Sequence, residues 1–119
     1  RFGRAARAAV TAWGLEVVAQ NPLEYSGVLT AVMMPDGRGA DAFRQVVLDR
    51  FDMSLGTGLG KLKDKIFRIG HLGDLNDLTL AGTLSGVEMG LALTGTRHKA
   101  GGVLAALETL ASESLAPVS

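Results

Sequence analysis

Residues 65–73 read Lys-Ile-Phe-Arg-Ile-Gly-His-Leu-Gly, and this stretch decides the fold. It is a short run of β-branched and aromatic residues that ends in glycines, which is typical of a β-strand followed by a turn. Side chains alternate across a strand, so Ile66, Arg68 and Gly70 share one face. The other face carries Phe67, Ile69 and His71. The sequence therefore predicts a strand with one arginine in an otherwise apolar segment.

The surroundings of Arg68 require an explanation, because burying a guanidinium without a partner is costly. Two structural roles would account for it: an internal ion pair, or a position on an edge strand from which the side chain reaches water. A functional role is also open, because the planar guanidinium can hold a carboxylate or phosphate through two parallel hydrogen bonds. The sequence alone leaves all three explanations open.

The composition excludes several classes of function. Twelve basic residues balance 12 acidic residues, which argues against a surface for nucleic acid or anionic membranes. The chain has no cysteine, so disulfides, thiolate chemistry and cysteine-based zinc sites are excluded. A hydrophobic fraction of 47% in 119 residues is enough for one globular domain with a modest core.

The first residues form an amphipathic helix that is already in progress at residue 1 or 2. Apolar side chains recur at helical spacing from Phe2 to Trp13, while Arg4 and Arg7 lie on another face. No capping residue and no methionine precede them. We therefore expect residues 1–119 to be one domain cut from a longer protein.

The order of the predicted elements indicates an α+β fold, a small, mainly antiparallel sheet with helices packed on one face. The glycine-rich residues 54–60 lack the Gly-Lys-Ser/Thr of a phosphate loop, so we interpret them as a flexible turn. Asp74 is the expected N-cap of the third helix, with Asp77 at its third position. The elements are predicted as helix 1–13, strand 15–18, strand 28–34, helix 41–51, the strand that begins near residue 65, helix 75–93 and helix 103–111.

Gly82, Gly86 and Gly90 recur every four residues in the third helix and leave one face without side chains. Small residues at this spacing also pack membrane helices, but Glu88 lies inside the apolar segment, which is too short to span a bilayer. We predict instead that another backbone packs closely against this face.

No self-sufficient active site is visible in the sequence. His71 and His98 are the only histidines, and neither has a second ligand at metal spacing. No serine lies in a nucleophile elbow, and helix capping accounts for Asp74 and Asp77. We therefore predict no catalytic, cofactor-binding or metal-binding residue within the chain.

A family resemblance rests on residues 67–74, Phe-Arg-Ile-Gly-His-Leu-Gly-Asp, which lead through Asn76-Asp77 and Gly82 to residues 86–90, Gly-Val-Glu-Met-Gly. This pattern resembles the C-terminal small domain of class V pyridoxal-phosphate aminotransferases, and within them the serine–glyoxylate branch. The resemblance implies that Arg68 binds the α-carboxylate of the substrate. It also implies that the glycine-rich stretch lies near the mouth of the active site.

The resemblance further implies that pyridoxal 5'-phosphate is bound by a large domain that is missing from this chain. The four lysines of the chain lie in no context that resembles the Schiff-base lysine motif, so the isolated fragment is expected to be inactive. The full-length protein would be a homodimer that moves the amino group of L-serine or alanine to glyoxylate, giving glycine. We expect neither nucleic acid nor membrane as a partner and a cytoplasmic location, since the chain ends Pro117-Val118-Ser119 rather than in a peroxisomal signal.

Two other functions remain open at this stage. A non-enzymatic α+β interaction module could dock a partner on the glycine face of the third helix. A small amino-acid-binding module could use Arg68 alone, which predicts measurable affinity in the isolated chain.

Overall fold

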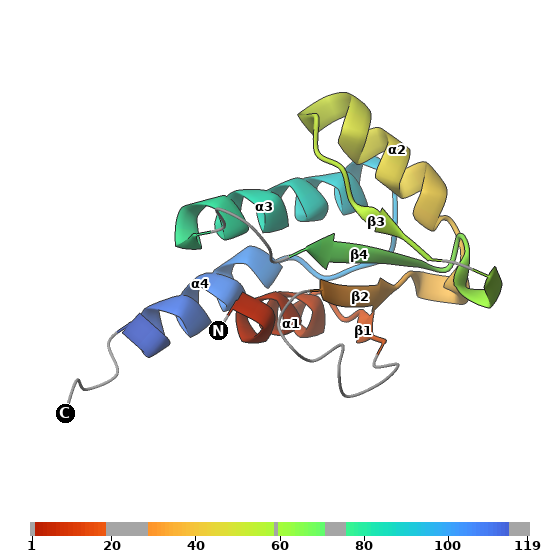
Figure 1. Ribbon diagram of the computed structural model, residues 1–119. Helices are drawn as coiled ribbons and strands as arrows, with labels where there is room; N and C mark the ends of the chain where they lie inside the picture. The colour runs from red at the N-terminus through yellow and green to blue at the C-terminus, as the bar shows by residue number, and fades with distance from the viewer. Residues whose placement is uncertain (1, 19–28, 59, 71–75, 115–119) are drawn as a thin grey trace.

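A four-stranded sheet lies at the centre of the computed structural model, which describes residues 2–18, 29–58, 60–70 and 76–114 (Figure 1). The strand order is β1-β2-β4-β3, and every pairing is antiparallel. The inner strands are β2 (Leu29–Met33) and β4 (Ile66–Gly70), while β1 (Glu16–Val17) and β3 (Gly56–Thr57) are two-residue edge strands.

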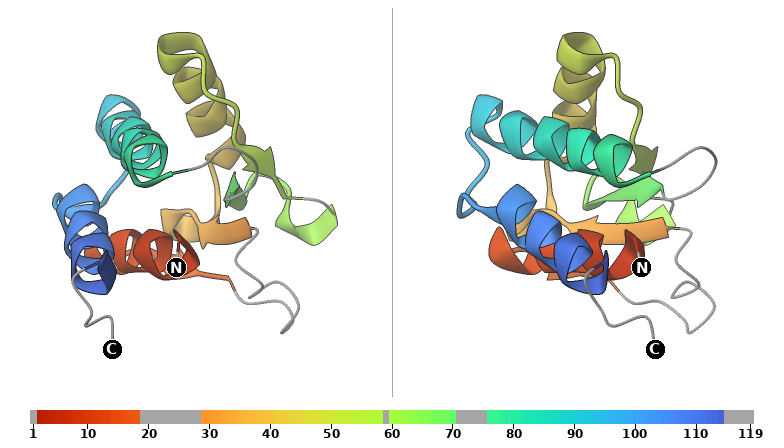
Figure 2. Two further views of the ribbon diagram at one scale, coloured as in Figure 1. Left: turned by 60° about the vertical axis from the view of Figure 1, so that its left-hand side comes forward. Right: turned by 90° about the vertical axis from the view of Figure 1, so that its left-hand side faces the viewer.

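The four α-helices of the described residues lie on one side of this sheet (Figure 2). They are α1 (Phe2–Ala12), α2 (Ala40–Phe51), α3 (Asp77–Leu93) and α4 (Gly102–Ser114). Two single turns of 3₁₀ helix, η2 (Pro35–Gly37) and η3 (Gly60–Leu62), complete the described structure. The α+β fold with an antiparallel sheet is confirmed. No helix in the described part of the chain has the length and apolarity that crossing a membrane requires.

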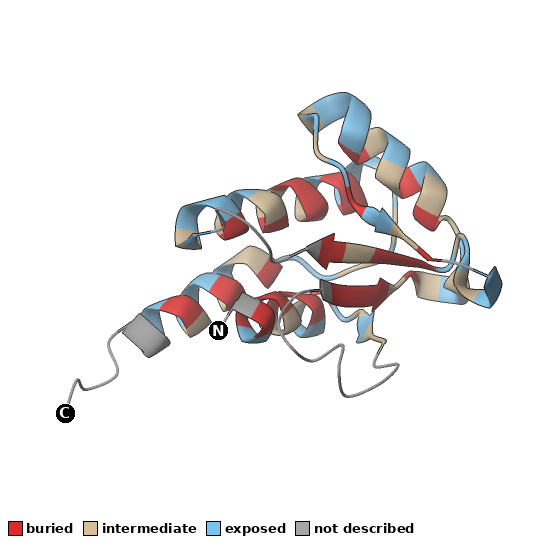
Figure 3. Ribbon diagram, in the orientation of Figure 1, coloured by how far each residue is buried: buried red, intermediate tan, exposed pale blue. Residues whose placement is uncertain are grey.

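The core lies between the helices and one face of the sheet (Figure 3). Val32 of β2 and Phe67 and Ile69 of β4 point into it and are fully buried. The ring centroids of Phe43 and Phe67 lie 4.7 Å apart, and this contact packs α2 against the sheet. The predicted alternation is therefore confirmed for residues 66–70, whereas His71 lies outside the described residues.

The glycine-rich segment differs from the prediction of a flexible turn. Its residues Gly56 and Thr57 form β3, which pairs with Arg68 and Phe67 of β4. Leu55 is buried beside it, and a Cβ atom built on Gly58 would lie 2.8 Å from Cγ1 of Ile66. The segment thus covers Ile66 on the face of the sheet opposite the core. A two-residue strand has no periodicity of its own, so the sequence pattern did not reveal it.

The prediction that Asp74 is the N-cap of α3 is wrong. Asn76 is the N-cap, because its side-chain oxygen accepts from the Thr79 backbone N–H at 2.9 Å. The Thr79 hydroxyl in turn accepts from the Asn76 backbone N–H at 2.7 Å, which completes a capping box. Asp77 is consequently the first helical residue rather than the third, and Asp74 lies outside the described residues.

The glycine face of α3 is filled by side chains of the same chain, not by a second backbone. A Cβ atom on Gly90 would lie 2.6 Å from Cγ2 of Val47, and one on Gly86 would lie 2.8 Å from Cε of Met53. Gly82 is exposed, with nothing within 4 Å of such an atom. Close packing was therefore predicted correctly for two of the three glycines, although its partner is α2 and the residues that follow it.

Glu88 of α3 joins three helices. Its Oε1 atom accepts from the Trp13 indole Nε1 at 2.6 Å and from the Gly102 and Val103 backbone N–H groups at 2.9 and 3.3 Å. Burial raises the pKa of the Glu88 carboxyl, but these hydrogen bonds outweigh it and hold the pKa below the ordinary value of 4.5. Glu88 thus acts as the N-cap of α4, supplied from another helix.

Candidate functional site

Arg68 lies in the middle of β4, between residues with very small side chains. Ala31 of β2 is its cross-strand neighbour on one side and Gly56 of β3 on the other. Because directly paired residues share a face, Ala31, Arg68 and Gly56 form one row on the side of the sheet opposite the core, here called the Arg68 face. No long side chain flanks Arg68 along this row.

The Arg68 side chain lies across β3. A Cβ atom built on Gly56 would lie 3.0 Å from the Cβ atom of Arg68 and 3.7 Å from both its Cγ and Cδ atoms. The side chain is half-buried. Among the described residues, its guanidinium has neither a hydrogen-bond nor an ion-pair partner.

These observations bear on two of the explanations that the sequence left open. Arg68 is not on an edge strand, because β4 is paired on both sides. It forms no internal ion pair with any residue that the structure describes. A half-buried guanidinium with no partner among the described residues is suited to binding an anion in a planar, bidentate geometry.

Side chains of α2 hold β3 in place beside Arg68. The Arg44 Nε atom donates to the Leu55 carbonyl oxygen at 2.8 Å, immediately before Gly56. Asp41 Oδ1 accepts from the Thr57 hydroxyl at 3.4 Å and lies 3.4 Å from Nη1 of Arg44. Thr57 of β3 and Leu55, the residue before this strand, are therefore each bonded to a side chain of α2, in addition to the pairing of β3 with β4.

The turn that leads into β4 is also tied to α2. Asp64 accepts from the Asp41 backbone N–H at 2.9 Å and from the Gly39 N–H at 3.2 Å. These two hydrogen bonds hold the pKa of the Asp64 carboxyl below its usual value, and the bond from Asp41 has the larger effect. Asp64 has a backbone φ of 64°, a left-handed conformation that Asp adopts more readily than most residues. It caps the start of α2 and so fixes α2 relative to the strand that carries Arg68.

Comparison with known proteins places the chain in a family. The serine–glyoxylate aminotransferase of Methylorubrum extorquens is 42% identical over 116 residues, which is 97% of this chain and 29% of that protein. The L-aspartate–glyoxylate aminotransferase of Paracoccus denitrificans is 41% identical over 91% of this chain and 28% of its own length. The chain belongs to the class V aminotransferases. It matches their C-terminal part and spans less than a third of these relatives.

A solved structure supports the same assignment of this aminotransferase domain. The pyridoxamine–pyruvate aminotransferase of Mesorhizobium loti superposes with a TM-score of 0.82 and 32% identity, over 94% of this chain and 29% of that one. A scan against models of protein families found no match.

Within the described part of the chain, the other polar residues considered from the sequence do not form a catalytic constellation. His98 Nδ1 lies 2.7 Å from the Thr96 carbonyl oxygen. Thr30 pairs with Ile69 and is buried on the core side, so it lies on the face opposite Arg68. No group of three acidic, histidine or cysteine residues within the described ranges could hold a metal ion.

The lysines of this domain do not fit a cofactor site of their own. Lys61 and Lys63 are exposed at and after η3, Lys65 is exposed just before β4, and Lys99 is exposed in the connection between α3 and α4. All four lysines therefore lie at exposed positions outside the four strands of the sheet.

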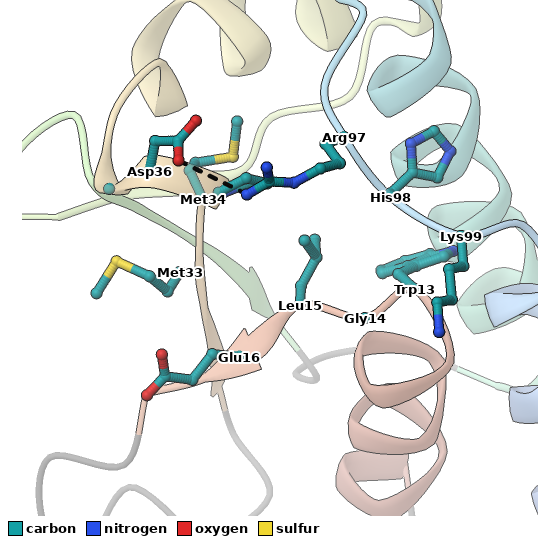
Figure 4. Close-up of a pocket in the computed structure, with 12 residues that line it drawn as sticks. Trp13, Gly14, Leu15, Glu16, Met33, Met34, Asp36, Arg97, His98 and Lys99 are labelled. Carbon is teal, nitrogen blue, oxygen red and sulfur yellow. Dashed lines mark ion pairs between the residues drawn. The ribbon is translucent and has the colours of Figure 1, made fainter.

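A pocket of about 530 Å³ lies beside β1 and the end of β2 (Figure 4). Its lining includes Glu16, Met33 and Asp36 together with the connection between α3 and α4. Arg97 and Asp36 face each other there at 3.6 Å, but both side chains are largely exposed. An ion pair of this kind contributes little to stability, and Arg68 is not part of this pocket.

Proposed function

We propose that the full-length protein is a pyridoxal-phosphate-dependent transaminase that moves the amino group of L-serine or alanine to glyoxylate, giving glycine. In this proposal Arg68 binds the α-carboxylate of the substrate. The observation that carries it is the half-buried Arg68 side chain on an inner strand, without a partner among the described residues.

The carboxylate is the part of the substrates that best fits such a site. The names of the relatives give different amino donors: serine, L-aspartate and pyridoxamine. Their acceptors are all 2-oxo acids, glyoxylate in two cases and pyruvate in the third, and every 2-oxo acid carries an α-carboxylate. A single guanidinium in the C-terminal domain can therefore serve acceptors of this class, while the donor is selected elsewhere.

The proposed contribution of Arg68 is orientation and charge pairing. Two parallel hydrogen bonds from the guanidinium fix both the position and the plane of the carboxylate. Fixing the carboxylate also fixes the direction of the neighbouring Cα–H bond, which lowers the entropic cost of reaching the reactive geometry. Proton transfer itself requires groups that we place outside this chain.

The remaining chemistry belongs, in this proposal, to a large domain outside residues 1–119. Pyridoxal phosphate supplies the electron sink of the reaction when it is bound there, together with its lysine and the carboxylate at its pyridine nitrogen. The assembly we propose is a homodimer, with amino-acid and 2-oxo-acid substrates as its partners. The isolated domain is then inactive.

The test is steady-state kinetics of the full-length enzyme with L-serine and glyoxylate. We expect Arg68→Ala to cost about 2–5 kcal/mol, the range for truncating one partner of a buried hydrogen-bonded charge pair. This corresponds to a loss in kcat/KM of roughly 30- to 5,000-fold. Arg68→Lys should recover little, because an ammonium group cannot form the bidentate fork.

Arg97→Ala is the matched control, since it removes an exposed arginine whose side chain is 79% accessible. It should leave kcat/KM unchanged. Kinetics of Arg68→Ala that match those of the wild type would refute the role of Arg68. Calorimetric titration of L-serine into the 119-residue chain should give no binding heat, whereas a measurable affinity would favour the amino-acid-binding module.

A further inference from the structure

We infer that Arg44 is a positioning residue for Arg68: by holding β3 against β4, it keeps the arginine of the candidate carboxylate site on an inner strand. This inference rests on the proposed role of Arg68 in binding the carboxylate. Arg44 belongs to α2 and is bonded to the residue that precedes β3, so its effect on Arg68 passes through the backbone of that strand.

The backbone of Arg68 is bonded on the β3 side and not on the β2 side. Arg68 lies opposite Ala31 of β2, but the Ala31 carbonyl oxygen accepts from the Val18 N–H, on the β1 side, at 2.8 Å. Opposite residues of antiparallel strands alternate between hydrogen-bonded and non-hydrogen-bonded pairs. The bond from the Met34 N–H to the Lys65 carbonyl oxygen, three pairs away, sets the same alternation. The strand that holds the backbone of Arg68 is therefore β3.

This strand is short for such a role. It consists of Gly56 and Thr57, which pair with Arg68 and Phe67. Pairing over so few residues supplies little stability by itself. If β3 separated from β4, Arg68 would lose the strand partner of its backbone and would lie on an exposed edge of the sheet.

Arg44 holds the peptide unit that begins β3. Its Nε atom donates to the Leu55 carbonyl oxygen at 2.8 Å, and this carbonyl shares one planar peptide unit with the Gly56 N–H. The N–H of a trans peptide points away from its carbonyl, so holding the carbonyl toward α2 keeps the N–H directed at β4. Asp41 lies 3.4 Å from the Arg44 guanidinium and accepts from the Thr57 hydroxyl at 3.4 Å, which adds a second tie to α2.

The bond from Arg44 is strong for its kind, because a charged group donates it and the Arg44 side chain is only 28% accessible. The Leu55 side chain is buried in the core and remains so without Arg44. Removing the guanidinium should therefore leave the fold intact and release the backbone of β3 selectively. A carboxylate would then bind to an arginine whose strand is held for a smaller fraction of the time.

Hydrogen exchange of the full-length enzyme, followed by mass spectrometry, measures how firmly β3 is held. Arg44→Leu should speed exchange in the peptide that covers residues 55–57 by roughly 10- to 100-fold, the factor for a hydrogen bond to a charged group. Arg50→Leu is the matched control, because Arg50 is an exposed arginine of the same helix. Equal exchange of this peptide in the two variants would overturn the inference.

A double-mutant cycle measures whether β3 acts on the carboxylate site. It comprises the wild type, Arg44→Leu, Arg68→Ala and the double variant, with the inhibition constant of acetate, a bare carboxylate, as the readout. Arg44→Leu should raise this constant roughly threefold or more where Arg68 is retained, because apparent affinity falls with the fraction of binding-competent protein. It should have no further effect in the Arg68→Ala background.

The turnover number separates positioning from a general loss of structure. At saturating L-serine, kcat of Arg44→Leu should be close to that of the wild type, because bound substrate draws the protein back to the form in which β3 is held. A fall in kcat with an unchanged acetate constant would overturn the inference. So would an equal change of the acetate constant with and without Arg68.

Two further arms keep the outcomes distinct. If Arg44→Leu does not fold, the same cycle is run with Thr57→Val, which removes the hydroxyl bond to Asp41 at almost constant volume; its effect on the acetate constant should likewise require Arg68. If Arg68→Ala leaves acetate inhibition unchanged, the proposed role of Arg68 fails, whatever hydrogen exchange shows. If Arg68→Ala weakens inhibition and Arg44→Leu does not, that role stands and the positioning inference fails.

Discussion

Replacing Glu88 tests how the helical layer of this domain is held together. Its carboxylate accepts from the Trp13 indole and from two backbone N–H groups at the start of α4. Trp13 is fully buried, so Glu88→Ala leaves its indole N–H without this acceptor and leaves the first turn of α4 uncapped. Both effects destabilise the folded state and leave the unfolded state unchanged.

The magnitude follows from the groups that lose a partner. A buried donor without an acceptor costs about 1–3 kcal/mol, and a lost N-cap costs about 0.5–2 kcal/mol. Glu88→Ala should therefore lower the free energy of unfolding by about 1.5–5 kcal/mol, a large part of the 5–15 kcal/mol typical of a domain. Glu88→Gln should cost less, because the amide oxygen still accepts but lacks the charge that strengthens the bonds.

The assay is urea denaturation of the 119-residue chain, followed by far-UV circular dichroism and by fluorescence of Trp13, the only tryptophan. With an m-value of about 2 kcal/mol per molar urea, the midpoint should fall by roughly 0.8–2.5 M in Glu88→Ala. The exposed Glu108 of α4 provides the control, since Glu108→Ala should change the midpoint little. A midpoint for Glu88→Ala within about 0.3 M of the wild type would refute the reasoning.

The same residue predicts a pH dependence. The pKa of Glu88 is lower in the folded protein than its ordinary value of 4.5, so the unfolded state binds the proton first as the pH falls. Its contribution to stability is therefore complete well above pH 4.5 and is lost as the pH falls from there through the folded pKa. Glu88→Gln should remove this component, and an unchanged acid profile would contradict the assignment.

Two further predictions concern packing and capping in the same chain. Gly90→Ala places a methyl group 2.6 Å from Cγ2 of Val47 and should lower the free energy of unfolding by about 1–3 kcal/mol. Gly82→Ala, at an exposed position, should raise it by about 1 kcal/mol. Equal urea midpoints for the two variants would refute this contrast. Asp64→Ala removes the side chain that caps α2, and it places alanine at a position with positive φ. It should lower the urea midpoint more than Asp64→Asn, because asparagine keeps a hydrogen-bond acceptor and tolerates positive φ. If Asp64→Asn is as unstable as Asp64→Ala, this explanation of the loss of stability is refuted.

Much of the fold could be predicted because the signals are local. The apolar alternation of residues 66–70 and the helical spacing from Phe2 to Trp13 identify elements that β4 and α1 confirm. Errors occur where two local solutions compete: Asp74 and Asn76 are both good capping residues, and the bond between Asn76 and Thr79 selects the second. Nothing in residues 54–60 indicates a strand, because β3 exists only through its pairing with β4.

The sequence by itself determined the α+β class, the strand with its arginine and the family resemblance, since each depends on residues close together in the chain. The tertiary structure alone decided the neighbours of Arg68, because Ala31 and Gly56 reach it only through strand pairing. It likewise decided that Glu88 caps α4 and bonds the tryptophan that follows α1. Contacts of this kind are set by how elements pack, and side chains that are distant in sequence carry no local signal of the partner that packing brings to them.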